Sequence, residues 1–165
     1  FCPENDVSLA DLTALCDAFY IGGTKCGALF GEAVVLPRPG LIPHFFTIIK
    51  QHGALLAKGR LLGIQFDTLF TDGLYEKLGA PAMAAADHIR AAMRECGYTL
   101  CFDSPTNQVF CILDNDTMAR LAQKVDFGFW EKYDDTHTIV RFATSWATDM
   151  DDVKLLKDAL RDARK

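Results

Sequence analysis

A single lysine lies in the middle of a glycine-rich stretch, where its amine could do covalent chemistry. The stretch AFYIGGTKCGALFGE covers residues 18–32, and Lys25 is surrounded by glycines at positions 22, 23, 27 and 31. Glycine permits turns with positive φ and lets another group approach the main chain closely, although it costs stability. Two interpretations fit this pattern: a tight hairpin with a surface lysine, or a lysine directed into a cofactor cavity.

The order of residues around Lys25 does not fit a nucleotide-binding P-loop. Such a loop places Gly-Lys before Ser or Thr, between a strand and a helix. Here Thr24 precedes Lys25, and a strand-like apolar run follows it. If the strands on both sides were buried, desolvation would favour the neutral amine that forms a Schiff base, the chemistry used with pyridoxal phosphate. The residues alone leave the hairpin interpretation open.

The composition predicts a soluble protein with a hydrophobic core. The 165 residues are 50% hydrophobic and 24% charged, enough to bury a core without requiring more than one domain. A net charge of −5 excludes an overall basic field, so neither nucleic acid nor an anionic membrane is an expected partner. Glu32, His44 and Lys50 interrupt the apolar runs, so no membrane-spanning helix is predicted.

Cysteine and histidine show no metal-binding or redox pattern. Cysteines at positions 2, 16, 26, 96, 101 and 111 form no C-x-x-C pair and have no histidine at zinc-finger spacing. We therefore expect no metal and reduced thiols in the cytoplasm. The four histidines, at positions 44, 52, 88 and 137, have no paired acid in sequence and are expected to be structural.

The first half of the chain mixes short strands with helices. Ser8 predicts the N-cap of a helix over 9–16, followed by strands near 18–21 and 28–36, the second buried on both faces. After a proline-rich break, a helix is predicted with Phe46, Ile49, Leu55 and Leu56 on its apolar side. Two further helices are expected over 60–78 and 81–95, the second opened by Pro81.

The second half predicts a small α+β unit. From Tyr98, two strand-like runs, a helix, two more strand-like runs and a last helix from Asp149 give the order ββαββα. This order is typical of an antiparallel sheet with helices on one face.

Three stretches together resemble the threonine aldolase family. They are AFYIGGTKCGALFGEAVVL, KGRLLGIQFDTLFTDGLY and VRFATSWAT, and the resemblance covers essentially the whole chain. It implies an α/β fold, the C-terminal part of a fold-type I pyridoxal phosphate enzyme that ends in a small α+β domain. Residues 1–52 would end the large cofactor-binding domain, 53–97 would be connecting helices, and 98–165 would be the small domain.

The resemblance assigns roles to four residues. Lys25 would carry pyridoxal 5'-phosphate as a Schiff base, and Thr24 would help to position it. Arg141 would bind the substrate carboxylate, whereas from the sequence alone it would point to water or pair with an acid. Arg60 either reaches the cofactor phosphate of a neighbouring subunit or is an ordinary charge at a helix end. Ser145 and Trp146 stand where the family often has other polar residues.

The implied activity is cleavage of a β-hydroxy amino acid such as threonine into glycine and an aldehyde. Members of the family are longer, so Phe1 looks like an end made either by processing or by deliberate truncation. This chain alone would lack an electron sink and be inactive. A missing N-terminal half and further copies, as a homodimer or homotetramer, would be its partners. The alternatives are a related fold-type I β-eliminating lyase with another substrate, and a non-catalytic interaction fragment.

Overall fold

The structure, a computed structural model, describes residues 7–165, so the predictions about Phe1 and Cys2 lie outside the described residues. The chain divides into two compact units, Phe1–Leu78 and Gly79–Lys165, named here the N-terminal and C-terminal units. The boundary falls within helix α4 (Leu74–Glu95), whose residues Ala85, Ala86, Ile89 and Met93 belong to the C-terminal core. The predicted three-part division remains a prediction.

The N-terminal unit begins with the capped helix that the sequence predicts. Helix α1 spans Leu9–Leu15, and Ser8 is its N-cap. The Asp11 amide donates to Ser8 Oγ at 3.1 Å, and the Ser8 amide donates to Asp11 Oδ2 at 2.8 Å. This reciprocal pair satisfies two amides that the first helical turn leaves without partners.

Two short strands enclose the lysine turn. Strand β1 (Phe19–Gly22) pairs antiparallel with β2 (Glu32–Val35), and the 3-10 turn η1 (Thr24–Cys26) lies between them. Tyr20 lies opposite Val34, and these side chains are 70% and 65% exposed. The prediction that the second strand is buried on both faces is therefore wrong for this chain, because among the described residues the sheet has only these two strands.

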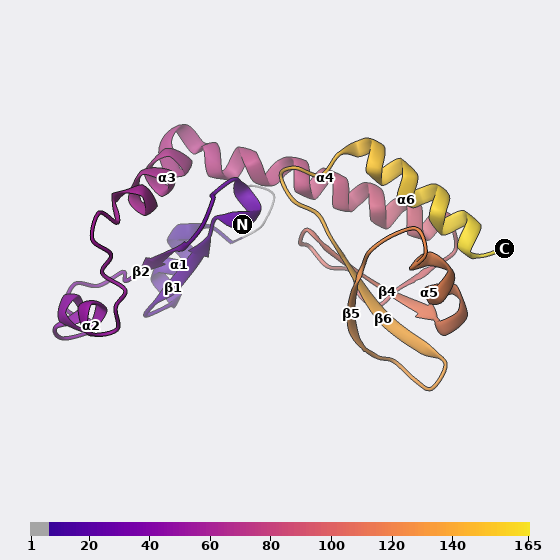
Figure 1. Cartoon of the computed structure of the whole chain (residues 1–165), viewed down its shortest axis with the longest axis horizontal. Helices are drawn as coiled ribbons and strands as arrows, with labels where there is room; N and C mark the ends of the chain where they lie inside the picture. The colour runs from indigo at the N-terminus through magenta and orange to yellow at the C-terminus, as the bar shows by residue number, and fades with distance from the viewer. Residues whose placement is uncertain (1–6) are drawn as a thin grey trace. The chain divides into compact units, whose positions relative to one another are not determined.

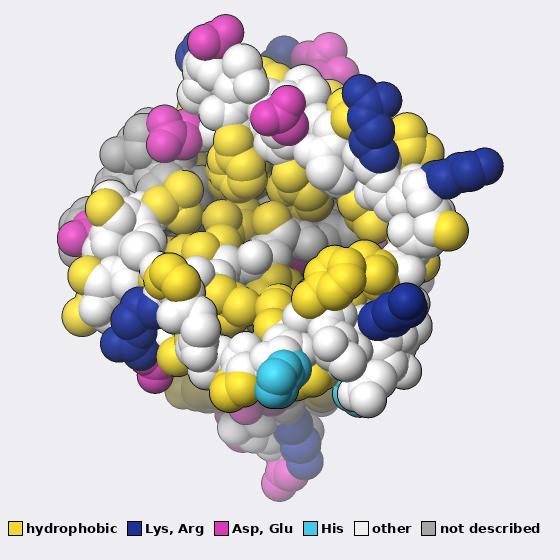
Figure 2. Space-filling model, turned by 90° about the vertical axis from the view of Figure 1, so that its left-hand side faces the viewer, with side chains coloured by type: hydrophobic (Ala, Val, Ile, Leu, Met, Phe, Trp, Pro, Cys, Tyr) yellow, Lys and Arg dark blue, Asp and Glu magenta, His cyan; other side chains and the backbone are white. Residues whose placement is uncertain are grey.

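The helix after the prolines is shorter than predicted. Helix α2 spans Phe45–Gln51 and ends where Gly53 takes a left-handed φ of 69°. Leu55 and Leu56 therefore lie beyond the helix and are exposed. Figure 2 looks onto the side where α2, α3 and β2 lie and shows hydrophobic side chains gathered on this face.

The long helical region breaks at a different place from the one predicted. Helix α3 spans Arg60–Phe70, the turn η2 spans Thr71–Gly73, and α4 follows directly. Asp72 and Gly73 both have positive φ, 53° and 67°, which stops the first helix. Pro81 lies inside α4, so it does not open a helix as predicted; α4 continues through it with one N–H donor fewer. No helix in the described part of the chain is long and apolar enough to cross a membrane.

The C-terminal unit is one four-stranded antiparallel sheet covered by helices. Its elements are β3 (Thr99–Leu100), β4 (Gln108–Asp114), α5 (Asn115–Leu121), β5 (Gly128–Lys132), β6 (His137–Ala143) and α6 (Met150–Ala163). The strand order is β3-β4-β6-β5, and α4 and α6 lie together on one face of the sheet (Figure 1). The predicted ββαββα order is confirmed.

The core of this unit lies between the sheet and the helices. Met93, Val140 and Leu160, from α4, β6 and α6, are fully buried there. Asp149 is the N-cap of α6 and accepts from the Asp151 amide at 2.9 Å, so the predicted helix start is confirmed. The five cysteines within residues 7–165 are free thiols.

Candidate functional site

Lys25 lies on a tight turn that the main chain closes on itself. The amides of Cys26 and Ala28 both donate to the Gly23 carbonyl, at 2.9 Å each. Gly27 ends the turn with a φ of 90°, a conformation that side chains other than glycine's rarely allow. Thr24 is the first residue of the same turn, so the structure brings Thr24 and Lys25 together.

The Lys25 side chain is exposed, as is that of Thr24. One interpretation of the sequence placed Lys25 between two buried strands. Residues 7–165 do not bury the Lys25 side chain in this way. The reason is the open two-stranded ribbon, in which exposed and half-buried residues alternate.

Tyr75, at the start of α4, fixes the beginning of the lysine turn. It is 7% exposed, and its hydroxyl donates to the Gly22 carbonyl at 2.8 Å. It packs with Ala28, Phe66 and Leu69 in the small core of this unit. Burial, together with the neighbouring Cys26, raises the pKa of Tyr75 to about 12, so the hydroxyl keeps its proton and remains a donor.

Gln65, on α3, fixes the end of the same segment. The Leu29 amide donates to Gln65 Oε1 at 3.0 Å, and Gln65 Nε2 donates to the Phe30 carbonyl. One amide side chain thus satisfies both a donor and an acceptor of the loop that leads away from Lys25. Together, Tyr75 and Gln65 hold the two sides of the turn onto the α3–α4 region.

Two glycines permit this close packing. A Cβ at Gly23 would lie 2.6 Å from Ala28 Cβ and 3.1 Å from the Phe66 ring. A Cβ at Gly31, whose φ is 79°, would lie 2.4 Å from Leu62 Cδ2. Two of the four glycines around Lys25 therefore permit the contact between its loop and α3.

Arg60 is the first residue of α3 and belongs to the same unit as Lys25. Its side chain is exposed and forms no ion pair with the described residues. A cation at a helix N-terminus opposes the helix dipole, so this placement does not serve the stability of α3. Both alternatives for Arg60, a contact with the cofactor phosphate of a neighbouring subunit and an ordinary charge at a helix end, stay predictions.

Arg141 lies on β6 in the C-terminal unit, on the sheet face away from α4 and α6. Its neighbours in the ladder are Phe110 on β4 and Gly128 on β5. The guanidinium carbon lies 5.5 Å from the centre of the Trp130 ring, and Arg141 Nη1 donates to Gln108 Oε1 at 3.5 Å. The side chain is half-buried.

The guanidinium of Arg141 has no carboxylate partner among residues 7–165. Arg141 is one of the residues that line a cavity of about 420 Å³, together with Phe127, Thr144 and Leu156. Asp126 and Asp152 line this cavity too, but neither forms an ion pair with Arg141. A half-buried cation whose charge is not neutralised is suited to binding an anion.

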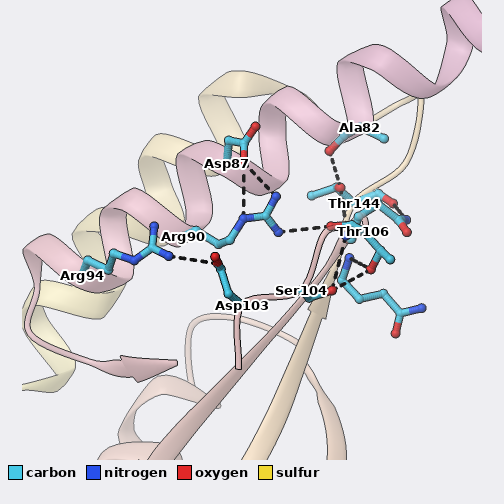
Figure 3. A network of polar contacts seen from close by, with 10 residues as sticks. Ala82, Asp87, Arg90, Arg94, Asp103, Ser104, Thr106 and Thr144 are labelled. Carbon is cyan, nitrogen blue, oxygen red and sulfur yellow. Dashed lines mark hydrogen bonds and ion pairs between the residues drawn. The ribbon is translucent and has the colours of Figure 1, made fainter. Parts of the chain in front are cut away.

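A polar network fixes the end of β6 just beyond Arg141. Thr144 Oγ1 donates to the Ala82 carbonyl of α4 at 2.6 Å, as Figure 3 shows. Arg90, 6% exposed, donates to the Thr106 carbonyl at 3.1 Å and to Asp87 Oδ1 at 2.8 Å. These contacts connect α4 to the segment just before β4 and to the segment just after β6. Ser145 and Trp146 follow directly, and Trp146 is 46% exposed.

One prediction about the histidines is wrong. His137 Nδ1 lies 3.0 Å from Asp134 Oδ1, so this histidine does have a paired acid. The turn between β5 and β6 brings the two residues together, and amides of Thr136 and His137 also donate to Asp134. Both side chains are exposed, which is typical of a turn-stabilising pair. The described residues contain no group of three His, Cys, Asp or Glu side chains that could hold a metal ion.

Comparison with known proteins identifies relatives over nearly the whole chain. No family model matches. A low specificity L-threonine aldolase from Pseudomonas sp. (strain NCIMB 10558) is 30% identical over 151 residues, which cover 88% of this chain and 41% of the relative. A solved structure of Leishmania major threonine aldolase is 42% identical, with a TM-score of 0.89, over 98% of this chain and 47% of that chain.

The chain is a threonine aldolase homologue. The resemblance predicted from the sequence is confirmed, as is the α/β fold class, and the matched region is the C-terminal portion of the relatives. The chain spans less than half of the length of the threonine aldolases it matches.

Sequence reasoning missed three residues: Gln65 and Tyr75, which hold the turn of Lys25, and Trp130, which lies beside Arg141. Gln65 carried a usable signal, because it lies between Leu62 and Leu69 on the apolar side of α3. A polar residue on such a face needs a hydrogen-bonding partner. Tyr75 and Trp130 gave no comparable signal, since aromatic residues near apolar neighbours are common in any core.

Proposed function

We propose that this chain is part of a pyridoxal phosphate-dependent lyase that cleaves the Cα–Cβ bond of a threonine-like β-hydroxy amino acid, giving glycine and an aldehyde. The observation that carries the proposal is the turn of Lys25, held at both sides by Tyr75 and Gln65, in a chain 42% identical to a threonine aldolase of known structure. A surface lysine alone would not require such support.

Each candidate residue has one task in this proposal. Lys25 holds the cofactor covalently, Thr24 positions it, and Arg60 approaches its phosphate from a neighbouring subunit. Arg141 binds the substrate carboxylate through its free N–H groups. Pyridoxal phosphate, when bound, supplies the electron sink that this cleavage needs.

The proposed partners follow from the same relatives. We expect the active protein to contain the N-terminal half that the matched aldolases have and to form a homodimer or homotetramer. The free cysteines support a cytoplasmic location. The 165-residue chain alone, given pyridoxal phosphate, should show no threonine cleavage; a cofactor-loaded, competent monomer in sedimentation and activity assays would contradict this account.

Labelling of the lysine tests the central assignment. The full-length protein is reduced with borohydride in the presence of pyridoxal phosphate, digested and examined by mass spectrometry. The pyridoxyl label should be on Lys25 and should be lost in Lys25→Ala, together with the visible absorption band of the bound cofactor. Lys50→Ala is the matched control, because Lys50 is also exposed. A label on Lys50 or Lys58 would refute the assignment.

A further inference from the structure

Strand β5 carries an irregularity beside Arg141. Phe129 lies opposite Val140 and Glu131 lies opposite Ile139, so Trp130 between them has no partner residue in the ladder. Such a bulge adds one residue to a strand and changes the direction of its side chains. Trp130 is the residue that this bulge places beside the guanidinium of Arg141.

Trp130 is itself held in place by the sheet. Its ring meets the Phe110 ring edge to face, with centres 5.0 Å apart and planes at 74°. Phe110 is 6% exposed and also contacts Phe102, with ring centres 4.7 Å apart. A buried ring thus supports Trp130 from the strand next to that of Arg141. Edge-to-face packing of this kind fixes the orientation of an aromatic side chain.

The contact with Trp130 orients Arg141 without using its hydrogen-bond donors. A ring attracts a guanidinium electrostatically, whereas a carboxylate would occupy N–H groups in the guanidinium plane. Of the five N–H donors, the long contact with Gln108 Oε1 at 3.5 Å engages one. Gly128 opposite has no side chain, and a Cβ there would lie 3.6 Å from Arg141 Nε and Nη2. Those nitrogens are therefore not hindered from that side.

We propose that Trp130 is a positioning residue, which holds the guanidinium of Arg141 so that its N–H edge meets the substrate carboxylate. This inference rests on the proposed function, because it assumes that Arg141 binds that carboxylate. It predicts that loss of the ring weakens substrate binding and leaves the bond-breaking step unchanged.

Steady-state kinetics of the full-length enzyme with threonine test the proposal. Trp130→Ala should raise KM about threefold, the change expected from one cation–π contact at a partly exposed site, with kcat unchanged. Trp130→Phe, which keeps a ring, should restore most of the affinity. Phe129→Ala is the matched control, because Phe129 adjoins Trp130 and is 69% exposed.

The double variant separates this inference from the proposed function. In an Arg141→Leu background, which carries no cation, Trp130→Ala should cause no further rise in KM, because the contact it removes is already lost. If Arg141→Lys raises KM but Trp130→Ala does not, the role of Trp130 is overturned and that of Arg141 stands. If Arg141→Lys leaves KM unchanged, both roles are overturned. Should Trp130→Ala fail to fold, Trp130→Leu provides the same comparison with an apolar side chain.

Discussion

The turn that carries Lys25 and the strand that carries Arg141 are held in opposite ways. Lys25 lies on an open ribbon, where side chains from two helices hydrogen-bond to the main chain on both sides of it. Arg141 lies on a central strand of a four-stranded sheet, with the packed core on the other face. The comparison teaches that a functional side chain can be placed either by a few specific polar contacts or by a rigid scaffold.

The largest expected difference between the two regions is in local stability. In the described chain, the C-terminal core contains Met93, Val140 and Leu160 among many buried side chains, whereas the N-terminal core is built around Phe66, Leu69 and Tyr75. In the 165-residue chain, amide hydrogens of β1 and β2 should exchange faster than those of β4 and β6 by on the order of a hundredfold or more. Equal protection measured by mass spectrometry would show that the ribbon needs no further partner.

The second test concerns the charge of Arg141. A bidentate, charge-assisted contact with a carboxylate contributes about 1.5 to 3 kcal/mol, against about 0 to 1 kcal/mol for an exposed ion pair. Arg141→Lys in the full-length enzyme should therefore raise KM for threonine roughly tenfold or more, with cofactor binding intact. Arg120→Lys is a control in the same unit, since Arg120 donates to the Ala163 carbonyl. Kinetics equal to those of the unaltered enzyme would make Arg141 a structural residue.

Two tyrosines provide a matched comparison between the units. Each is 7% exposed and donates to a main-chain carbonyl at 2.8 Å: Tyr75 to Gly22, and Tyr98 to Leu160. Each replacement by phenylalanine should cost about 1 kcal/mol of unfolding free energy in its own unit. Only Tyr75→Phe should also speed amide exchange around residues 22–27. If Tyr98→Phe has the same effect there, the hydroxyl of Tyr75 does not hold the lysine turn.

The smallest effect is expected in the turn between β5 and β6. Hydrogen bonds from the Thr136 amide and from His137 lower the pKa of Asp134 to about 2. Because the folded-state pKa is below the ordinary value of 3.8, the stabilisation is present above about pH 4 and is lost as the pH falls towards 2. Asp134→Asn should flatten the fall in melting temperature over this range. Asp135→Asn removes a carboxylate from the same turn without removing these contacts and is the control.

The sequence predicted the C-terminal unit better than the N-terminal one, for a physical reason. Strands such as β4 and β6 are fixed by burial on a regular sheet, and burial leaves a clear apolar pattern. The break between α3 and α4 depends on the positive φ of Asp72. A pattern of apolar residues cannot predict this backbone angle. Pro81 misled the prediction, because a long helix with a packed apolar side tolerates one missing amide donor.

The candidate functional residues of the two units were predictable only in part. Lys25 and Arg141 were found because charged residues stand out in glycine-rich or apolar runs. Gln65 and Tyr75, which hold the turn of Lys25, were not found. Each hydrogen-bonds to a main-chain group that is distant in sequence, 36 residues away for Gln65 and 53 for Tyr75. No local pattern links residues at such separations.

The side-chain amide of Gln65 imitates a peptide group. It accepts from the Leu29 amide and donates to the Phe30 carbonyl, so one side chain pairs with a main-chain donor and a main-chain acceptor. Glutamate has almost the same shape but presents a second oxygen where the donor should be, facing the carbonyl of Phe30. Deamidation at this single position during ageing or storage would therefore replace an attraction by a repulsion. The position of the loop beside Lys25 would then depend on whether the side-chain amide of Gln65 stays intact.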